Sequence, residues 1–247
     1  MEEIIITGAS RGFGRHIAHQ LAKEGRRLHL ISRGKSKKTA DEVRERGGEV
    51  MSWPMDLSLT DHIEESFKPV LNEIGKESAD FIGLINNAGT LKPVGPLGKY
   101  DTGDYRSHLE LNYVSPALLT HLFVKRFQDV SATKRVLFVG SGASRRPIHG
   151  WSHYCSSKAG VDMLAKTVAL EQDTMKHPVK TTVFNPGRIE TDMQKLLREL
   201  DKEDFPLVDD FIASATDGRN LPPEQMAEEL AAIFTGNEFP HGEITGR

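Results

Sequence analysis

The amino-acid sequence predicts a doubly wound α/β fold, in which helices cover both faces of a parallel sheet of about seven strands. Three observations predict this fold. Short apolar runs alternate with longer segments of helical periodicity, a glycine-rich turn follows the first apolar run, and no repeat or low-complexity linker divides the chain. A length of 247 residues is within the range of one α/β domain, so we expect a single domain over residues 1–247.

Six short runs rich in β-branched and apolar residues indicate strands. Their sequences are EEIIIT (2–7), RLHLIS (27–32), GEVMSWP (48–54), FIGLIN (81–86), KRVLFVG (134–140) and KTTVFN (180–185). Helices are expected at about residues 12–25, 36–46, 58–75, 104–128, 152–176 and 222–235. Because these helical segments are long enough to cross the sheet, neighbouring strands should be parallel.

The stretch 188–221 interrupts this alternation. It combines a short helical piece, ETDMQKLLREL, with acidic and proline-containing loop. In an open parallel sheet the loops beyond the carboxyl ends of the strands surround the ligand, so we expect this stretch to be a mobile substrate lid. A variable surface excursion is the alternative interpretation.

The composition is that of an ordinary soluble globular protein, with 38% hydrophobic and 27% charged residues and a net charge of -3. The basic residues form no stripe, so no nucleic-acid partner is expected. The first residues, MEEIIITGAS, are acidic where a secretory signal is basic, and their apolar run is too short for a membrane span, which favours a cytoplasmic protein. With Cys155 as the only cysteine, an internal disulfide and a thiolate metal cluster are both excluded, and no metal site is expected.

A glycine-rich segment, TGASRGFG, joins the first strand to the first helix. Gly8, Gly12 and Gly14 have the spacing G-x3-G-x-G, which differs from the general dinucleotide pattern G-x-G-x-x-G. A turn at this position brings backbone N–H groups and the positive end of a helix against a pyrophosphate. A tight turn without a ligand is the alternative, but the position at the first strand-to-helix junction favours dinucleotide binding.

Three further motifs follow in order: NNAG (86–89), Tyr154-x3-Lys158 with Ser141 thirteen residues earlier, and NPG (185–187) with Thr191 after it. Together with the glycine segment they resemble the short-chain dehydrogenase/reductase superfamily, over residues 3 to about 245. The resemblance implies a Rossmann-like fold, a nicotinamide cofactor and carbonyl reduction. It also implies cofactor contacts at Gly8, Ser10, Arg11, Gly12, Phe13, Gly14, Asn87, Ala88, Gly89, Tyr154, Lys158, Pro186, Gly187, Ile189 and Thr191.

The residues after the second and third strands bear on the choice of cofactor. The second strand ends in Ser32-Arg33-Gly34-Lys35, without the acidic residue that selects NAD, so we expect NADPH with Arg33 on its 2′-phosphate. The resemblance implies a second cation there, Arg11. It also implies that Asp56 and Leu57 contact the adenine, although Asp56 is nearly as typical of the first turn of a helix.

Tyr154 and Lys158 lie four residues apart on an expected helix and therefore share one face. Reduction of a ketone needs a proton donor near neutral pH, and a nearby ammonium lowers the pKa of a phenol from about 10. In the terms of the resemblance, Tyr154 is the acid and Lys158 lowers its pKa and holds the nicotinamide ribose. Ser141 then hydrogen-bonds the substrate oxygen, and Asn112 holds a water in the proton relay. A surface Tyr–Lys pair and a capping serine are the alternatives.

The runs HGWSHYCSSKAGVDML (149–164) and NPGRIETDMQ (185–194) are similar to the branch that contains sepiapterin reductases and bacterial enzymes that reduce benzil. Trp151 and Met193 would then line a pocket for a flat dicarbonyl substrate, although a core aromatic is the alternative for Trp151. Sepiapterin reductases have an aspartate near the C-terminus that anchors the pterin, and this sequence places Gly246 there. The resemblance therefore implies a ketone or an α-diketone such as benzil as substrate, and weak pterin binding.

Several functions stay open on the sequence. Within enzymes, the alternatives are a sepiapterin reductase and a 3-oxoacyl-carrier-protein reductase. A non-catalytic NADP-binding sensor is the alternative from a different class, because a fold alone does not specify chemistry. His149 and His153 are interpreted as surface or pocket-wall residues. The helices expected at 104–128 and 152–176 correspond to those that pair between subunits in the superfamily, which implies a homodimer or homotetramer.

Overall fold

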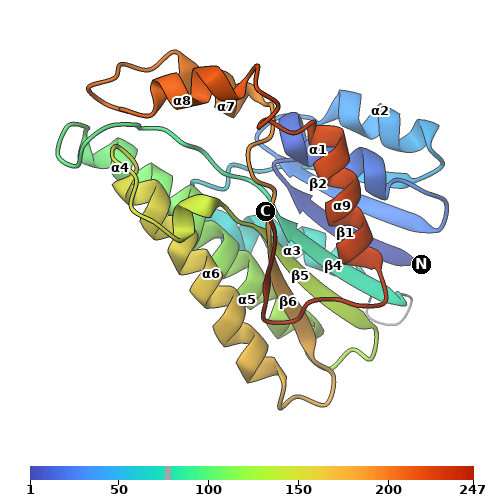
Figure 1. Cartoon of the computed structure of the whole chain (residues 1–247). Helices are drawn as coiled ribbons and strands as arrows, with labels where there is room; N and C mark the ends of the chain where they lie inside the picture. The colour runs from blue at the N-terminus through green and yellow to red at the C-terminus, as the bar shows by residue number, and fades with distance from the viewer. Residues whose placement is uncertain (76–78) are drawn as a thin grey trace.

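The strands form a parallel sheet in a computed structural model that describes residues 1–75 and 79–247. Within these residues seven strands pair in the order β3-β2-β1-β4-β5-β6-β7, and every pairing is parallel (Figure 1). The strand order reverses between β1 and β4, which confirms the doubly wound fold. The strands are β1 (Glu2–Thr7), β2 (Arg26–Ser32), β3 (Glu49–Pro54), β4 (Phe81–Asn86), β5 (Thr133–Val139), β6 (Val179–Asn185) and β7 (Ile244–Gly246).

The helices agree with the sequence prediction to within a few residues at most ends. One expected helix, 104–128, is divided by a π-turn over Glu110–Val114, and β7 was not located from the sequence. None of the described helices has the length and apolar composition needed to cross a membrane. The helices are α1 (Gly12–Leu21), α2 (Lys37–Glu45), α3 (Ile63–Glu73), α4 (Thr102–Leu109), α5 (Ser115–Phe127), α6 (Ser152–Gln172), α7 (Asp192–Arg198), α8 (Val208–Ser214) and α9 (Pro223–Thr235).

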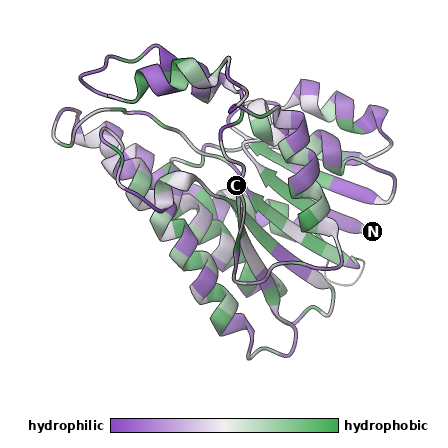
Figure 2. Cartoon of the chain, viewed as in Figure 1, coloured by the Kyte–Doolittle hydropathy of each residue, from purple (hydrophilic) through white to green (hydrophobic). Residues whose placement is uncertain are grey.

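Buried apolar residues cover both faces of the sheet, as a parallel sheet packed on two sides requires. Hydrophobic residues colour much of the central strands (Figure 2). Successive side chains of a strand point to opposite faces. Ile4 and Ile6 of β1 therefore pack with α1, α2 and α9, whereas Ile5 packs with α3, α5 and α6. These two cores hold the strand ends in fixed relative positions, and the site is built on those ends.

The two ends of the stretch 188–221 lie side by side where it joins the rest of the domain. Ile189 and Leu221 form an isolated parallel bridge, in which the Glu190 N–H donates to the Leu221 oxygen at 3.1 Å. The Leu221 N–H donates to the Arg188 oxygen at 2.8 Å. The stretch carries α7 and α8, which stand apart from the two helical layers (Figure 1).

Candidate active site

A cleft of about 890 Å³ opens at the carboxyl ends of the strands, and residues that follow β1 to β6 line it. Of the site residues predicted from the sequence, Asn112 does not line the cleft. In the described residues, no group of three or more His, Cys, Asp or Glu side chains could hold a metal ion. The predicted residues that line the cleft are Gly8, Ser10, Arg11, Gly12, Phe13, Gly14, Arg33, Asp56, Leu57, Asn87, Ala88, Gly89, Ser141, Trp151, Tyr154, Lys158, Pro186, Gly187, Ile189, Thr191 and Met193.

The glycine segment brings the first turn of α1 close to β1. Gly12 has a φ of +54°, in the left-handed region that favours glycine. A Cβ on Gly14 would lie 2.4 Å from the Gly8 oxygen, so only glycine permits this approach. The geometry leaves the N-terminal N–H groups of a ten-residue helix directed toward the cleft, which suits a pyrophosphate.

The NNAG run ties β4 to β1 beneath the glycine segment. The Thr7 hydroxyl accepts from the Asn87 N–H at 2.9 Å and from the Ala88 N–H at 3.0 Å. The Asn87 side-chain amide donates to the backbone carbonyl oxygen of Thr7 at 2.9 Å. Asn87 therefore has a structural role in addition to its position in the cleft wall.

The far end of the cleft carries two exposed cations. Arg33 follows β2, and Arg11 lies in the glycine segment 3.7 Å from the Asp192 carboxylate, in a pair that is more than two-thirds exposed on both sides. Such an exposed pair contributes little and leaves Arg11 available to a phosphate. This end of the cleft therefore fits the 2′-phosphate of NADP.

Asp56 holds a turn just before the next helical segment, which begins at Thr60, and not the first helical turn that the alternative interpretation predicted. Its Oδ1 accepts from the Ser58 N–H at 3.0 Å and from the Ser58 hydroxyl at 2.7 Å. Burial opposes ionisation of Asp56, but these hydrogen bonds and the Arg33 charge lower its pKa overall. The carboxylate stays charged, and Oδ1 is already engaged by the turn.

Tyr154, Lys158 and Ser141 meet at the centre of the cleft. Tyr154 and Lys158 come from the first turns of α6 and are each 8% exposed. The Lys158 Nζ donates to the Val139 oxygen at 2.8 Å and lies 5.8 Å from the centroid of the Tyr154 ring. Ser141 follows β5, and its hydroxyl accepts from the Ala143 N–H at 3.2 Å.

The pKa of Tyr154 differs from the prediction. Burial raises the pKa of Tyr154 above the ordinary value of a phenol, although the hydrogen bond with Ser141 acts to lower this pKa. Burial also lowers the pKa of Lys158 to about 8, although the Asp162 charge opposes this. The net lowering of the Tyr154 pKa expected from Lys158 is not seen in this arrangement, because desolvation of the phenol dominates and the Lys158 Nζ donates to the Val139 oxygen. Tyr154 is therefore protonated at neutral pH, as a proton donor must be.

Asn112 lies behind the cleft wall. It is 2% exposed in the π-turn, where the Ser115 N–H donates to the Glu110 oxygen. The Asn112 Nδ2 donates to the Thr90 oxygen at 2.8 Å, and Oδ1 accepts from the Thr90 N–H at 2.9 Å. The side chain thus binds the backbone of the cleft wall, so it is not free to hold the relay water that the sequence interpretation assigned to it.

The sequence interpretation missed two buried residues, each one helical turn from a predicted catalytic residue. His108 precedes Asn112 by four positions, and their side chains are 2.9 Å apart. Asp162 follows Lys158 by four positions. Burial raises the pKa of Asp162, and its negative charge acts to raise the pKa of Lys158. The i, i+4 spacing was the signal that could have identified both residues.

The substrate end of the cleft is aromatic. Trp151 is 6% exposed, its ring lies edge-to-face with Tyr154 at 5.1 Å, and it stacks on Phe205 of the stretch 188–221 at 4.9 Å. Met193 of α7 is 36% exposed and also lines the cleft. Trp151 is therefore both a pocket wall and part of a small apolar core with Phe205.

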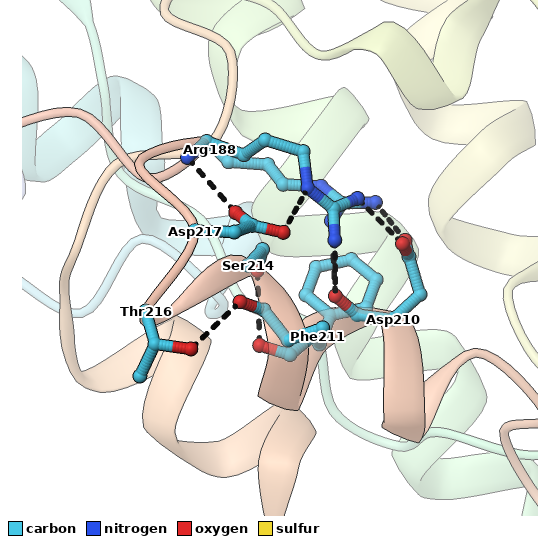
Figure 3. A network of polar contacts seen from close by, with 8 residues as sticks. Arg188, Asp210, Phe211, Ser214, Thr216 and Asp217 are labelled. Carbon is cyan, nitrogen blue, oxygen red and sulfur yellow. Dashed lines mark hydrogen bonds and ion pairs between the residues drawn. The ribbon is translucent and has the colours of Figure 1, made fainter.

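A charged network ties α8 to both ends of the stretch 188–221 (Figure 3). Asp210 accepts from Arg188 near one end and from Arg219 near the other, and both cations lower its pKa. The Arg188 guanidinium also lies 4.2 Å from the centroid of the Phe211 ring. The Arg219 Nε donates to Asp217 at 2.7 Å. One carboxylate thus holds the two ends of the stretch to its second helix.

Comparison with known proteins agrees with this architecture. A family model described as short chain dehydrogenase matches residues 2–202. The chain is 36% identical over 244 residues to benzil reductase ((S)-benzoin forming) of Bacillus cereus, covering 99% of this chain and 98% of the relative. It is 30% identical over 249 residues to sepiapterin reductase of Mus musculus, covering 96% and 93%. The crystal structure of a metagenomic short-chain oxidoreductase in complex with NADP matches with a TM-score of 0.76 and 25% identity, covering 100% of this chain and 96% of that one.

Proposed function

Because this chain belongs to the short-chain dehydrogenase family and is an oxidoreductase that acts on C=O and CH–OH groups, we propose that it reduces a ketone or an α-diketone with NADPH. One observation carries the proposal: the buried Tyr154 and the Ser141 hydroxyl share a cleft with the aromatic wall of Trp151. A proton donor, a hydrogen-bonding partner for the carbonyl oxygen and a surface for a flat ring are thus adjacent.

The cofactor residues fit NADPH, which supplies a hydride when bound. The N–H groups of the glycine segment and of the first turn of α1 bind the pyrophosphate. Arg33 and Arg11 bind the 2′-phosphate, and Lys158 holds the nicotinamide ribose. The remaining cleft residues would form the walls around the nicotinamide; they are Asn87, Ala88, Gly89, Pro186, Gly187, Ile189 and Thr191.

The protein's own contribution to the reaction is a positioned proton. Ser141 donates a hydrogen bond to the carbonyl oxygen, and Tyr154 transfers its phenolic proton to that oxygen as negative charge develops. Its raised pKa keeps the proton in place until then. Lys158 provides the positive charge that stabilises the phenolate left behind. Since the side chain of Asn112 is engaged with Thr90, we assign it no direct part in the proton relay.

Aromatic α-diketones are the substrate class that fits this wall. Trp151 and Met193 offer apolar contact, which discriminates weakly among flat rings. The similarity to a relative named benzil reductase supports this assignment. The stretch 188–221 acts as the lid, since Phe205 reaches Trp151 from it.

Selective pterin binding would need a buried polar anchor. Gly246 has a φ of +87°, and a Cβ there would lie 2.1 Å from the Asn185 oxygen, so this position of β7 accepts no side chain. Sepiapterin reduction is nevertheless the second candidate, because the chain also resembles sepiapterin reductases over most of its length.

Steady-state oxidation of NADPH tests the proposal, with benzil, sepiapterin and a 3-oxoacyl thioester as substrates and NADH as the alternative coenzyme. We expect the highest kcat/KM with benzil and NADPH, and formation of benzoin by product analysis. A preference for sepiapterin would point to another polar anchor in the cleft. Absence of turnover with every carbonyl compound, while NADPH still binds, would instead support a sensor.

A further inference from the structure

His108 joins α4 to the wall of the cleft. It is 1% exposed, and its Nδ1 lies 2.9 Å from the Lys92 oxygen. Its Nε2 lies 2.9 Å from the Asn112 Nδ2. The His108 side chain therefore contacts the cleft wall directly at Lys92. It also contacts the wall indirectly, because Asn112 hydrogen-bonds the Thr90 backbone.

These contacts determine the proton positions on His108. The Lys92 carbonyl can only accept, so Nδ1 carries the hydrogen. The Asn112 Oδ1 accepts from the Thr90 N–H, which turns Nδ2 toward His108. Nδ2 can only donate, so Nε2 is the unprotonated nitrogen. His108 is thus a neutral imidazole in one tautomer, with both nitrogens hydrogen-bonded inside the protein.

A second histidine holds the next carbonyl of the same wall. His153 directly precedes Tyr154 on α6, is buried, and hydrogen-bonds the Pro93 oxygen through Nε2. Its ring lies perpendicular to that of His108, with centroids 4.2 Å apart. His153 is therefore a buried structural residue, and the two rings connect α4, the wall and the start of α6.

We propose that His108 is a positioning residue for the reductase reaction: it accepts from Asn112, which holds Thr90, and through this bond it fixes residues 89–92 of the cleft wall relative to Tyr154, while its bond to the Lys92 oxygen orients the ring. This inference rests on the proposed function, since it assigns the wall a place in the reaction. The ring centroids of His108 and Tyr154 are 6.0 Å apart, so a small displacement of His108 reaches the phenol. Rate depends steeply on such positions.

The hydrogen bonds of His108 to Asn112 and Lys92 require its neutral state. Around His108 the titratable groups are His153, Tyr154 and Lys158 on α6, whereas Lys92 contributes its backbone carbonyl. Burial lowers the pKa of His108 to about 4. Protonation would place a hydrogen on Nε2, facing the N–H donor of the Asn112 amide. The hydrogen bond between His108 and Asn112 would then be lost, and with it the hold on the cleft wall. Since the unfolded value is about 6.5, His108 takes up more protons in the unfolded chain between pH 6.5 and 4, and the folded state loses stability as pH falls through this range.

Three substitutions separate the two hydrogen bonds. His108→Phe keeps the ring and removes both bonds, His108→Gln keeps a group at the Nε2 position that accepts from Asn112, and His108→Asn keeps a donor at the Nδ1 position. We expect His108→Phe to lower kcat about tenfold or more, with the Kd of NADPH changed less than about threefold. His108→Gln should recover most of the lost kcat, and His108→Asn little of it. The control His149→Phe changes an exposed histidine and should have no effect.

The melting temperatures show whether the role is only structural. The Gln and Asn variants each lose one hydrogen bond, so both should melt at similar temperatures while their kcat values differ. Equal kcat in these two variants would overturn the proposal. In a double-mutant cycle with Asn112→Ala, the effect of His108→Phe on kcat should largely disappear, whereas additive losses would contradict action through Asn112.

A measurement without turnover separates this inference from the proposed function. In the wild-type protein, ¹⁵N chemical shifts of the His108 imidazole should show protonated Nδ1 and unprotonated Nε2 from pH 8 to 5. The opposite tautomer, or a transition near pH 6.5, would overturn the inference even if every variant were unstable. If the wild-type protein reduces no carbonyl compound, the proposed function fails and the role of His108 in the reaction fails with it, whereas this NMR result would still confirm its contacts.

Discussion

Asp210 holds α8 to both ends of the stretch 188–221, so its replacement by alanine should loosen this stretch, the proposed lid, without disturbing the sheet. The carboxylate receives Arg188 on one oxygen and Arg219 on the other. Both cations come from positions close to the bridge between Ile189 and Leu221, where the stretch joins the body. No other described carboxylate contacts both arginines. Asp210→Ala therefore removes the link between the base of the lid and its second helix.

The exposure of the three side chains limits the size of the effect. Asp210 is 39% exposed, Arg188 23% and Arg219 45%, so solvent screens both pairs. The Asp210–Arg188 pair contributes about 0.2–1 kcal/mol, and the more exposed pair with Arg219 adds little. This range corresponds to an increase of about 1.4- to 5-fold in the ratio of open to closed lid. Since the pairs are partly exposed, the difference should shrink in about 1 M salt.

Amide hydrogen exchange across 190–220 measures this opening directly. We expect exchange in α7 and α8 to accelerate by the same factor of about 1.4 to 5 in Asp210→Ala, with exchange in β1 and β4 unchanged. The KM for the carbonyl substrate should rise much less than this factor while the closed lid predominates, because KM increases only as the closed fraction falls. Asp209→Ala is the matched control, since Asp209 lies next in sequence and its carboxylate is paired with Lys202 and with no arginine in the described part of the chain. Equal exchange in the two variants would refute the role assigned to Asp210.

Three other substitutions test the site and the assembly. Tyr154→Phe should lower kcat by about 10²–10⁴ while NADPH titration and the melting temperature stay near the wild-type values, and near-normal turnover would contradict its role as the acid. Arg33→Asp should weaken NADPH by about 1.5–3 kcal/mol and spare NADH in fluorescence titrations; unchanged binding of both would make Arg33 a surface cation only. The exposed Met163 and Leu170 of α6 should lie in a homodimer interface, so light scattering should show a dimer or tetramer that Leu170→Glu weakens. A 27.5 kDa particle for the wild-type chain at micromolar concentration would contradict this.

Much of the fold could be predicted from the sequence because the signals for strands, helices and turns are local. EEIIIT and FIGLIN coincide with β1 and β4, since an apolar run bounded by turn residues has few other conformations in a covered parallel sheet. The glycine segment was equally clear, because Gly14 permits an approach that no other residue does. The limits of the stretch 188–221 were also close to those of the bridge that closes it.

The order of the elements, the ends of the strands and therefore the residues that line the cleft follow from local sequence signals, because parallel strands end at one edge. Which side chains meet behind that edge depends on the packing of the whole fold. This packing turned Asn112 away from the cleft toward Thr90 and His108, divided its helix by a π-turn, and buried Tyr154 and Lys158 so that desolvation sets their pKa values. These outcomes depend on how α4, α6 and the loop after β4 pack together. They could not be predicted, because contacts between segments far apart in the chain leave no periodic signal in the sequence.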